Sequence, residues 1–148
     1  MKDQLPILLF DLDGTLVDTA PDLVATLNTI LAKHDRAPMT IESVKKLIGD
    51  GARALLERGF EATGAPASGL DALMADFIDI YVAASTVHSR PYHGAVDALE
   101  GFAAAGYRMA VCTNKPQAPS ETILHELDLM RFFDTVVGGD RFPVHKPD

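Results

Sequence analysis

The fold of this 148-residue chain is decided near its start, by the stretch Ile7-Leu8-Leu9-Phe10-Asp11-Leu12-Asp13-Gly14-Thr15. Four apolar residues in a row, bounded by Pro6 and Gly14, are typical of a parallel strand that is covered on both faces. An acidic residue closes the run, and the glycine allows a sharp turn. We therefore predict a buried strand over residues 7–10 with Asp11 and Asp13 at its carboxyl end.

A helical block follows this strand. Between Thr19 and His88 the apolar residues recur at helical spacing, and the pattern predicts helices over about 21–34, 41–48, 52–62 and 70–84. Nothing in the block has the pattern of a strand. The apolar stripe from Leu70 to Ala84 is interpreted as the core of this block rather than as a partner surface.

After Pro91 the pattern alternates between helix and strand. It predicts a helix over about 96–103, a strand over 107–112, a helix over 120–129 and a short strand over 135–137. Strands that alternate with helices are typical of a parallel α/β sheet. We expect an α/β fold in two domains: a Rossmann-like core of residues 1–17 and 89–148, and an inserted helical domain of residues 18–88.

Composition and charge exclude several classes of protein. The chain has 13 basic and 21 acidic residues, a net charge of −8, which argues against nucleic-acid binding. Its apolar stretches are shorter than a membrane helix requires, and its N-terminus is too short and too acidic for a signal peptide. The lone Cys112 excludes an intrachain disulfide and favours a reducing compartment. We expect a cytoplasmic protein with no nucleic-acid or membrane partner.

The residues after the first strand have the chemistry of a catalytic site. Ligands bind open α/β sheets at the carboxyl ends of the strands, and residues two apart on an extended chain point the same way. Asp11 and Asp13 could therefore bind a divalent cation, or act as nucleophile and general acid. Gly14 and Thr15 could contact a phosphate oxygen. The alternative is a turn with solvated acids, which the apolar strand and the Gly-Thr pair disfavour.

Three motifs in order resemble those of the haloacid-dehalogenase-like phosphohydrolases. Residues 11–15 resemble the first motif of that family, Thr113-Asn114-Lys115 its phosphate-binding motif, and Lys146-Pro147-Asp148 its lysine motif. The helical block resembles the α-helical cap that these enzymes insert after the first motif. Residues 138–140 and 48–51 look most like those of the phosphoglycolate phosphatases within the family.

This resemblance implies a Mg²⁺-dependent phosphatase acting on a small phosphorylated metabolite, with 2-phosphoglycolate as the first candidate. Asp11 would attack phosphorus and form an aspartyl phosphate, and Asp13 would protonate the leaving alkoxide and then deprotonate water. Mg²⁺ would bind the Asp11 carboxylate and the Asp13 carbonyl. The phosphate would be held by Gly14, Thr15, Thr113, Asn114 and Lys146.

The resemblance also implies that a loop of the cap faces the site and selects the substrate; its residues are Gly49, Asp50, Gly51 and Arg53. The alternative is a plain interhelical turn with a solvated arginine. Asn114 and Lys115 could equally cap the following turn. The five histidines show no metal-ligand spacing, and Cys112 is interpreted as a small buried apolar residue.

Other functions are consistent with parts of this pattern. A sugar-phosphate phosphatase or a phosphomutase would use the same motifs. A receiver-like phosphoacceptor domain also uses an aspartate, a threonine and a lysine, but the long helical insertion after the first strand disfavours it. An inactive relative is a further alternative.

The position of the last residue leads to one more expectation. In the resembled family, the lysine motif is followed by further strands and by an acidic loop that binds Mg²⁺, whereas this sequence stops at Asp148. We expect a truncated form of a longer phosphatase, with weak metal binding and slow turnover. Residues 7–10 would form an exposed apolar sheet edge that could drive self-association.

Overall fold

A parallel three-stranded sheet forms the α/β part of the computed structural model, which describes residues 5–148. The predicted first strand is β1 (Leu8–Phe10), which pairs in parallel with β4 (Met109–Cys112), and β4 pairs in parallel with β5 (Thr135–Val137). The strand order β1-β4-β5 places β1 at an edge, as predicted. The expectation of a parallel α/β fold is confirmed.

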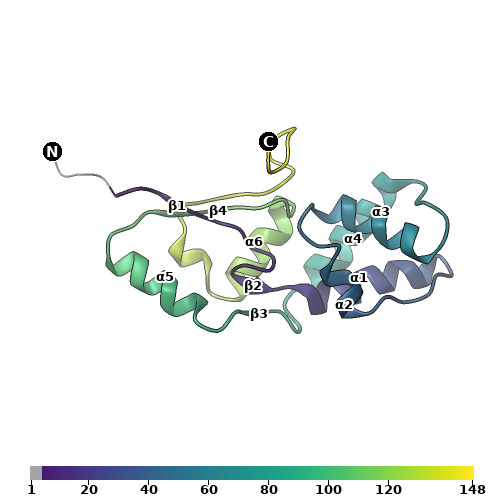
Figure 1. Cartoon of the computed structure of the whole chain (residues 1–148), viewed down its shortest axis with the longest axis horizontal. Coiled ribbons are helices and arrows are strands. Elements are labelled where there is room, and N and C mark those ends of the chain that lie inside the picture. Colours follow the sequence, from purple (N-terminus) through teal and green to yellow (C-terminus); the bar gives the residue numbers. More distant parts are fainter. Residues whose placement is uncertain (1–4) are drawn as a thin grey trace.

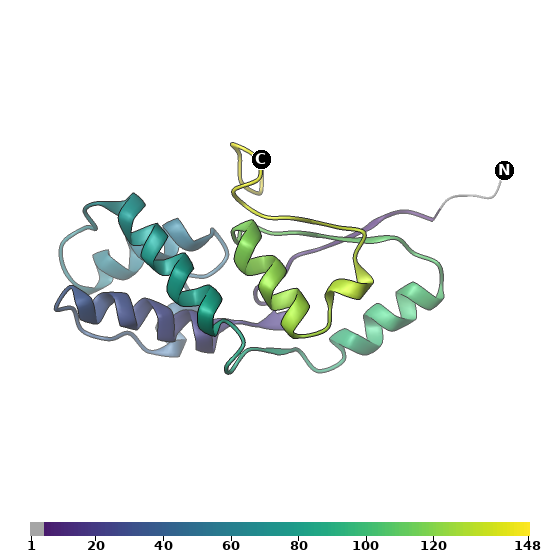
Figure 2. The ribbon, with the colours of Figure 1, turned by 180° about the vertical axis from the view of Figure 1, so that it is seen from behind.

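Only one face of this sheet is covered by helices in the described residues. Helices α5 (Ala95–Ala104) and α6 (Gln117–Glu126) both lie below the strands in Figure 1 and again in the reverse view of Figure 2. Phe10 points to that side and packs its ring against Phe102 of α5, whereas Leu9 is 69% exposed. The prediction that this strand is covered on both faces is therefore wrong for residues 5–148, because an apolar run does not reveal how many layers cover it.

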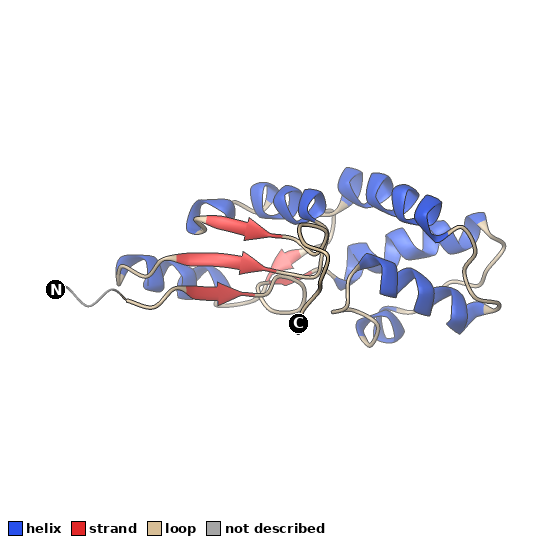
Figure 3. Cartoon of the chain, turned by 90° about the horizontal axis from the view of Figure 1, so that it is seen from above, coloured by secondary structure: helices blue, strands red, loops and turns tan. Residues whose placement is uncertain are grey.

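The segment from Ala20 to Ala84 folds as a helical bundle, as predicted. Its helices are α1 (Ala20–Lys33), α2 (Ile41–Lys45), α3 (Ala52–Thr63) and α4 (Leu70–Ala84). Their apolar faces bury Leu27, Leu56 and Phe77 in a shared core. Figure 3 shows this bundle beside the sheet, at the end toward which the parallel strands point. None of the helices in the described part of the chain has the length and apolar character to span a bilayer.

Some element boundaries differ from the predicted ones. Helix α2 ends at Lys45 rather than near residue 48, and α6 covers residues 117–126 rather than 120–129. Asp128 adopts a φ of 56°, which interrupts the helix, and a short 3-10 helix, η1 (Met130–Phe132), follows. The left-handed conformation of a single residue is not visible in hydrophobic spacing.

Two short strands that the sequence did not predict connect the bundle to the sheet. β2 (Val17–Asp18) and β3 (Arg90–Pro91) pair antiparallel where the chain leaves the α/β part and where it returns. Strands of two residues are too short to show periodicity. They place the two connections side by side.

Asp22 fastens these connections together. It lies in the first turn of α1, is 2% exposed, and accepts hydrogen bonds from the backbone N–H groups of His88 and Ser89 and from the Ser89 hydroxyl. A buried carboxylate with several donors is stable, but its removal leaves those donors unpaired.

We predict that Asp22→Ala lowers the free energy of unfolding by about 3 kcal/mol, because it orphans buried donors at the junction. The exposed ion pair of Lys33 with Asp76 offers the control, since Asp76→Ala should cost less than about 1 kcal/mol. Urea unfolding followed by circular dichroism measures both. Equal losses in the two variants would contradict the role of Asp22.

Candidate active site

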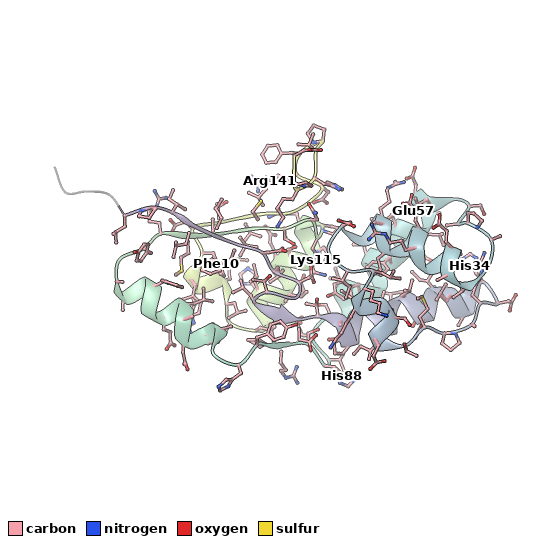
Figure 4. All side chains as sticks on the ribbon, in the orientation of Figure 1. Phe10, His34, Glu57, His88, Lys115 and Arg141 are labelled. Carbon is pink, nitrogen blue, oxygen red and sulfur yellow. The ribbon has the colours of Figure 1, made fainter. Side chains whose placement is uncertain are left out.

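The carboxyl ends of β1 and β4 open into a cavity that the helical bundle covers. The cavity is partly open to solvent, and the centre of a water-sized sphere can occupy about 30 Å³ of it. On the α/β side it is lined by Asp11, Asp13, Thr113, Lys115, Pro116 and Pro119, and on the helical side mainly by apolar groups of Ile48, Ala52, Leu55, Phe77 and Ile78. Figure 4 labels Lys115 at the boundary between the two parts.

Asp11 is the more accessible of the two paired acids. Its Oδ1 accepts a hydrogen bond of 2.8 Å from the backbone N–H of Leu12 and lies 3.3 Å from Nζ of Lys146. Lys146 also donates to the carbonyl oxygen of Cys112 at 2.8 Å, which ties it to the end of β4. The structure therefore brings the aspartate of the first motif and the lysine of the third motif together.

Asp13 is held from two sides on a single oxygen. Its Oδ1 accepts a hydrogen bond of 2.6 Å from the Thr19 hydroxyl and lies 3.0 Å from Nζ of Lys115. The Asp13 side chain is 12% exposed, so this ion pair is largely shielded from water. Its other oxygen has no hydrogen-bond partner within residues 5–148, and it is available to a ligand.

Lys115 is a buried cation whose charge the fold stabilises. Its Nζ donates to the Tyr81 hydroxyl at 3.0 Å and lies 4.2 Å from the centre of that ring. Burial alone would lower the pKa of Lys115, but the attraction of Asp13 and the contact with Tyr81 outweigh burial and raise the pKa above its usual value. Burial raises the pKa of Tyr81 to about 12. Near neutral pH the lysine is therefore charged and the tyrosine is neutral.

The second motif contributes one residue to the cavity wall and one to its support. Thr113 is buried, lines the cavity, and accepts a hydrogen bond of 3.1 Å from the backbone N–H of Lys115. The Asn114 side chain instead donates to the carbonyl oxygens of Gly49 and Lys146 and accepts from the N–H of Lys146. Asn114, predicted to bind phosphate, does not line the cavity; it connects the loop before α3 to the lysine motif.

The remaining predicted residues are divided between the cavity and its surroundings. Gly49 and Gly51 line the cavity, whereas Asp50 pairs with Arg58 and Arg53 with Asp71, both on the exposed surface. Gly14 borders a second, adjoining hollow beside Asp13, and Thr15 lines neither space. The loop thus faces the site, but its arginine does not.

Gly51 explains why this loop can approach so closely. It has a φ of +91°, and a Cβ there would lie 2.9 Å from the carbonyl oxygen of Asn114. A larger residue would be strained and would also push the loop away from the second motif.

The oxygen donors of the site do not form a complete metal centre. No group of three or more His, Cys, Asp or Glu side chains that could hold a metal occurs among residues 5–148. Asp11 and Asp13 are the acids in the cavity, and each has a lysine close by. Mg²⁺ takes about six oxygen ligands, several of which are usually waters, so these residues could supply only part of its coordination shell.

Two residues of the site were not identified from the sequence as functional. The sequence left Lys115 undecided between a turn cap and a substrate contact, and it placed Tyr81 within an apolar core stripe. The sequence offered one signal for Tyr81: its hydroxyl is a polar group on an otherwise apolar helix face, which could have marked it as a possible site residue. Its contact with Lys115 depends on how α4 packs against the α/β part, which hydrophobic periodicity does not report.

Comparisons with known proteins agree with this geometry. Residues 8–148 match the family model of the haloacid dehalogenase-like hydrolases. The chain is 49% identical over 141 residues to a phosphoglycolate phosphatase of Caulobacter vibrioides, covering 94% of this chain and 60% of that protein. It is 42% identical over 145 residues to one of Agrobacterium fabrum, covering 97% of this chain and 62% of that protein.

A solved structure shows the same fold. The crystal structure of a predicted phosphoglycolate phosphatase from Haemophilus somnus superposes with a TM-score of 0.90 at 29% identity, covering 99% of this chain and 68% of that one. The chain thus spans 60% and 62% of the length of the two curated relatives above.

We predict that Tyr81 makes the fold sensitive to alkali. The proton of an unfolded tyrosine is lost near pH 10.0, whereas folding raises the pKa of Tyr81 to about 12. The contribution of protonated Tyr81 to the free energy of unfolding is therefore complete below about pH 10, and it is lost as the pH rises toward about 12. When the pH rises from about 9 to about 11, the free energy of unfolding of the unmodified chain should fall. The fall should be on the order of 1 kcal/mol smaller for Tyr81→Phe, which has no hydroxyl to ionise.

Urea unfolding at the two pH values measures this difference. Tyr107→Phe is the control, because it removes a tyrosine from outside the cavity, and it should follow the unmodified chain. A parallel loss of stability in Tyr81→Phe and the unmodified chain would contradict the prediction.

Proposed function

This chain belongs to the haloacid dehalogenase-like hydrolase family, and from that membership we propose that it hydrolyses a small phosphomonoester, with 2-phosphoglycolate as the first candidate. The observation that carries the proposal is the position of Asp11 in a covered cavity, with Lys146 beside it and Asp13 two residues away. The names of the curated relatives support the choice of substrate.

In the proposed first step, a carboxylate oxygen of Asp11 forms a bond to phosphorus while the bond from phosphorus to the ester oxygen breaks. For this step Asp13 must carry a proton; the departing oxygen takes that proton and leaves as the alcohol, and an aspartyl phosphate remains on Asp11. In the second step, Asp13 removes a proton from water, whose oxygen attacks phosphorus. Inorganic phosphate leaves and the Asp11 carboxylate is restored.

Lys146 and Thr113 are suited to stabilise the transferred phosphoryl group. Lys146 lies 3.3 Å from Asp11, so its charge is next to the position where phosphorus must come. Thr113 brings a hydroxyl into the cavity from the end of β4. A fixed cation and a hydroxyl in a covered site lower the cost of the developing charge.

The cover over the cavity supports a small substrate. Gly49, Gly51 and the apolar side chains of α3 and α4 face the two acids from the helical bundle. This wall would shield a bound phosphate from bulk water and would limit the size of the group attached to it. We propose that the bundle acts as a cap that admits metabolites and rejects large phosphoproteins.

Mg²⁺ is proposed as the cofactor, held weakly by Asp11 and the backbone carbonyl of Asp13. A bound cation would supply positive charge that offsets the repulsion between the Asp11 carboxylate and an anionic phosphate. We also propose a cytoplasmic location, because a single cysteine favours a reducing compartment. The domain boundaries after residues 17 and 88 also stay predictions.

Self-association through β1 is a further proposal. Ile7 and Leu9 are 57% and 69% exposed at an edge strand, and exposed apolar edges favour pairing with another chain. Sedimentation equilibrium gives the solution mass, and a monomer at high protein concentration would contradict it.

We predict that Asp11→Asn lowers the rate of phosphate release from 2-phosphoglycolate by at least about 1,000-fold, because an amide is a poor nucleophile. A phosphate-release assay with a Mg²⁺ titration measures it, and mass spectrometry excludes deamidation back to aspartate. The control is Asp76→Asn, an exposed acid of α4, which should keep its activity. Ordinary turnover by Asp11→Asn would contradict an aspartyl-phosphate pathway.

We predict that the loss caused by Asp13→Asn depends on the leaving group. Turnover of an alkyl phosphate should fall by about 100-fold or more, since its alkoxide needs a proton, whereas p-nitrophenyl phosphate should suffer less. Steady-state kinetics with both esters measures the difference. Equal losses on both esters would show that Asp13 is not the acid.

A further inference from the structure

Lys115 and Tyr81 place two unused hydrogen-bond donors at one point of the cavity. The ammonium group has three N–H donors, of which two have partners in Asp13 and the Tyr81 hydroxyl. The Tyr81 oxygen accepts from Lys115, and its own hydrogen has no acceptor among residues 5–148. One N–H and one O–H therefore lie side by side without an oxygen acceptor, and the only other contact of the ammonium group among the described residues is with the Tyr81 ring.

Both groups are deeply buried. Lys115 is 5% exposed and Tyr81 is fully buried, although both line the cavity. Unused donors in such a position are costly unless a ligand or water accepts their hydrogen bonds. The rest of the helical wall near them is apolar, with Leu55, Phe77 and Ile78.

The two lysines of the site stand beside different acids. Lys146 lies next to Asp11, where the phosphate must bind, whereas Lys115 lies next to Asp13 and α4. A ligand with a single anionic group needs only one of these cations. Two cations at separate positions match a ligand with two anionic groups.

From these observations we infer that Lys115 and Tyr81 bind the carboxylate of the substrate, so that the site selects small phosphomonoesters that carry a carboxylate close to the phosphate. The inference rests on the proposed phosphatase function and assigns the specificity of that site. One carboxylate oxygen accepts the free N–H of Lys115 and the other accepts the Tyr81 hydroxyl. Tyr81 belongs to α4, so selection requires the helical bundle to be in place.

Two non-hydrolysable ligands test the inference without depending on turnover. 3-Phosphonopropanoate has the shape of 2-phosphoglycolate with a methylene in place of the ester oxygen, and propylphosphonate lacks its carboxylate. Isothermal titration calorimetry on the full chain should show about 100-fold tighter binding of the first. Tyr81→Phe should reduce this preference about 10-fold, and Lys115→Met should remove nearly all of it.

Lys33→Met is the matched control, because it removes an exposed lysine of α1 and should leave the preference unchanged. Equal binding of the two ligands to the unmodified chain would overturn the inference. The inference would also be overturned if the variants weakened the binding of both ligands by the same factor. In either case, binding of the phosphonates would still agree with the proposed function. Failure of both ligands to bind would overturn the proposed function as well. If Lys115→Met does not fold, Tyr81→Phe decides alone, since it removes one oxygen atom.

Discussion

A buried ammonium ion must have an anion beside it, and much of this molecule is arranged around that requirement. Lys115 is taken out of water at the end of β4 and pairs with Asp13, which follows β1. Its hydrogen bond to Tyr81 reaches into α4 of the helical bundle. One cation thereby links the first motif, the second motif and the bundle, and its charge is paired with the Asp13 carboxylate, the form that removes a proton from water in the second proposed step.

The same junction depends on close backbone approach at Asn114. A Cβ on Gly51 would lie 2.9 Å from the carbonyl oxygen of Asn114, and one on Gly139 would lie 2.1 Å from it. The two glycines come from the loop before α3 and from the end of β5. Their lack of side chains lets three separate segments meet, and the Asn114 amide then holds the loop and the lysine motif by hydrogen bonds.

The sequence predicted most of the architecture because its signals were local and repeated. The run before Asp11 indicated a strand, and the spacing of apolar residues indicated the helices of the bundle. The strands β2 and β3 were too short for such a signal, and the single covered face of β1 depends on tertiary packing. Within the site, the family resemblance implied that Asp11 and Lys146 would act on the same phosphate, and the structure places them 3.3 Å apart. The buried contact of Lys115 with Tyr81 joins residues 34 apart in sequence, and no periodicity encodes it.

The distribution of contacts also indicates how a ligand can enter a covered cavity. Separation of the bundle from the α/β part would widen the entrance to the cavity, and it would break the hydrogen bonds from Lys115 to Tyr81 and from Asn114 to Gly49. Asp13 and Lys115 both belong to the α/β part, so the buried cation keeps its anion when the bundle moves away. Asp22 holds the two connections together by accepting hydrogen bonds from the backbone N–H groups of His88 and Ser89, so separation of the bundle need not break these bonds. Opening would therefore cost the hydrogen bond from the Lys115 ammonium to the neutral Tyr81 hydroxyl, one amide hydrogen bond and the packing of α4 on α6, but it would leave no charge unpaired.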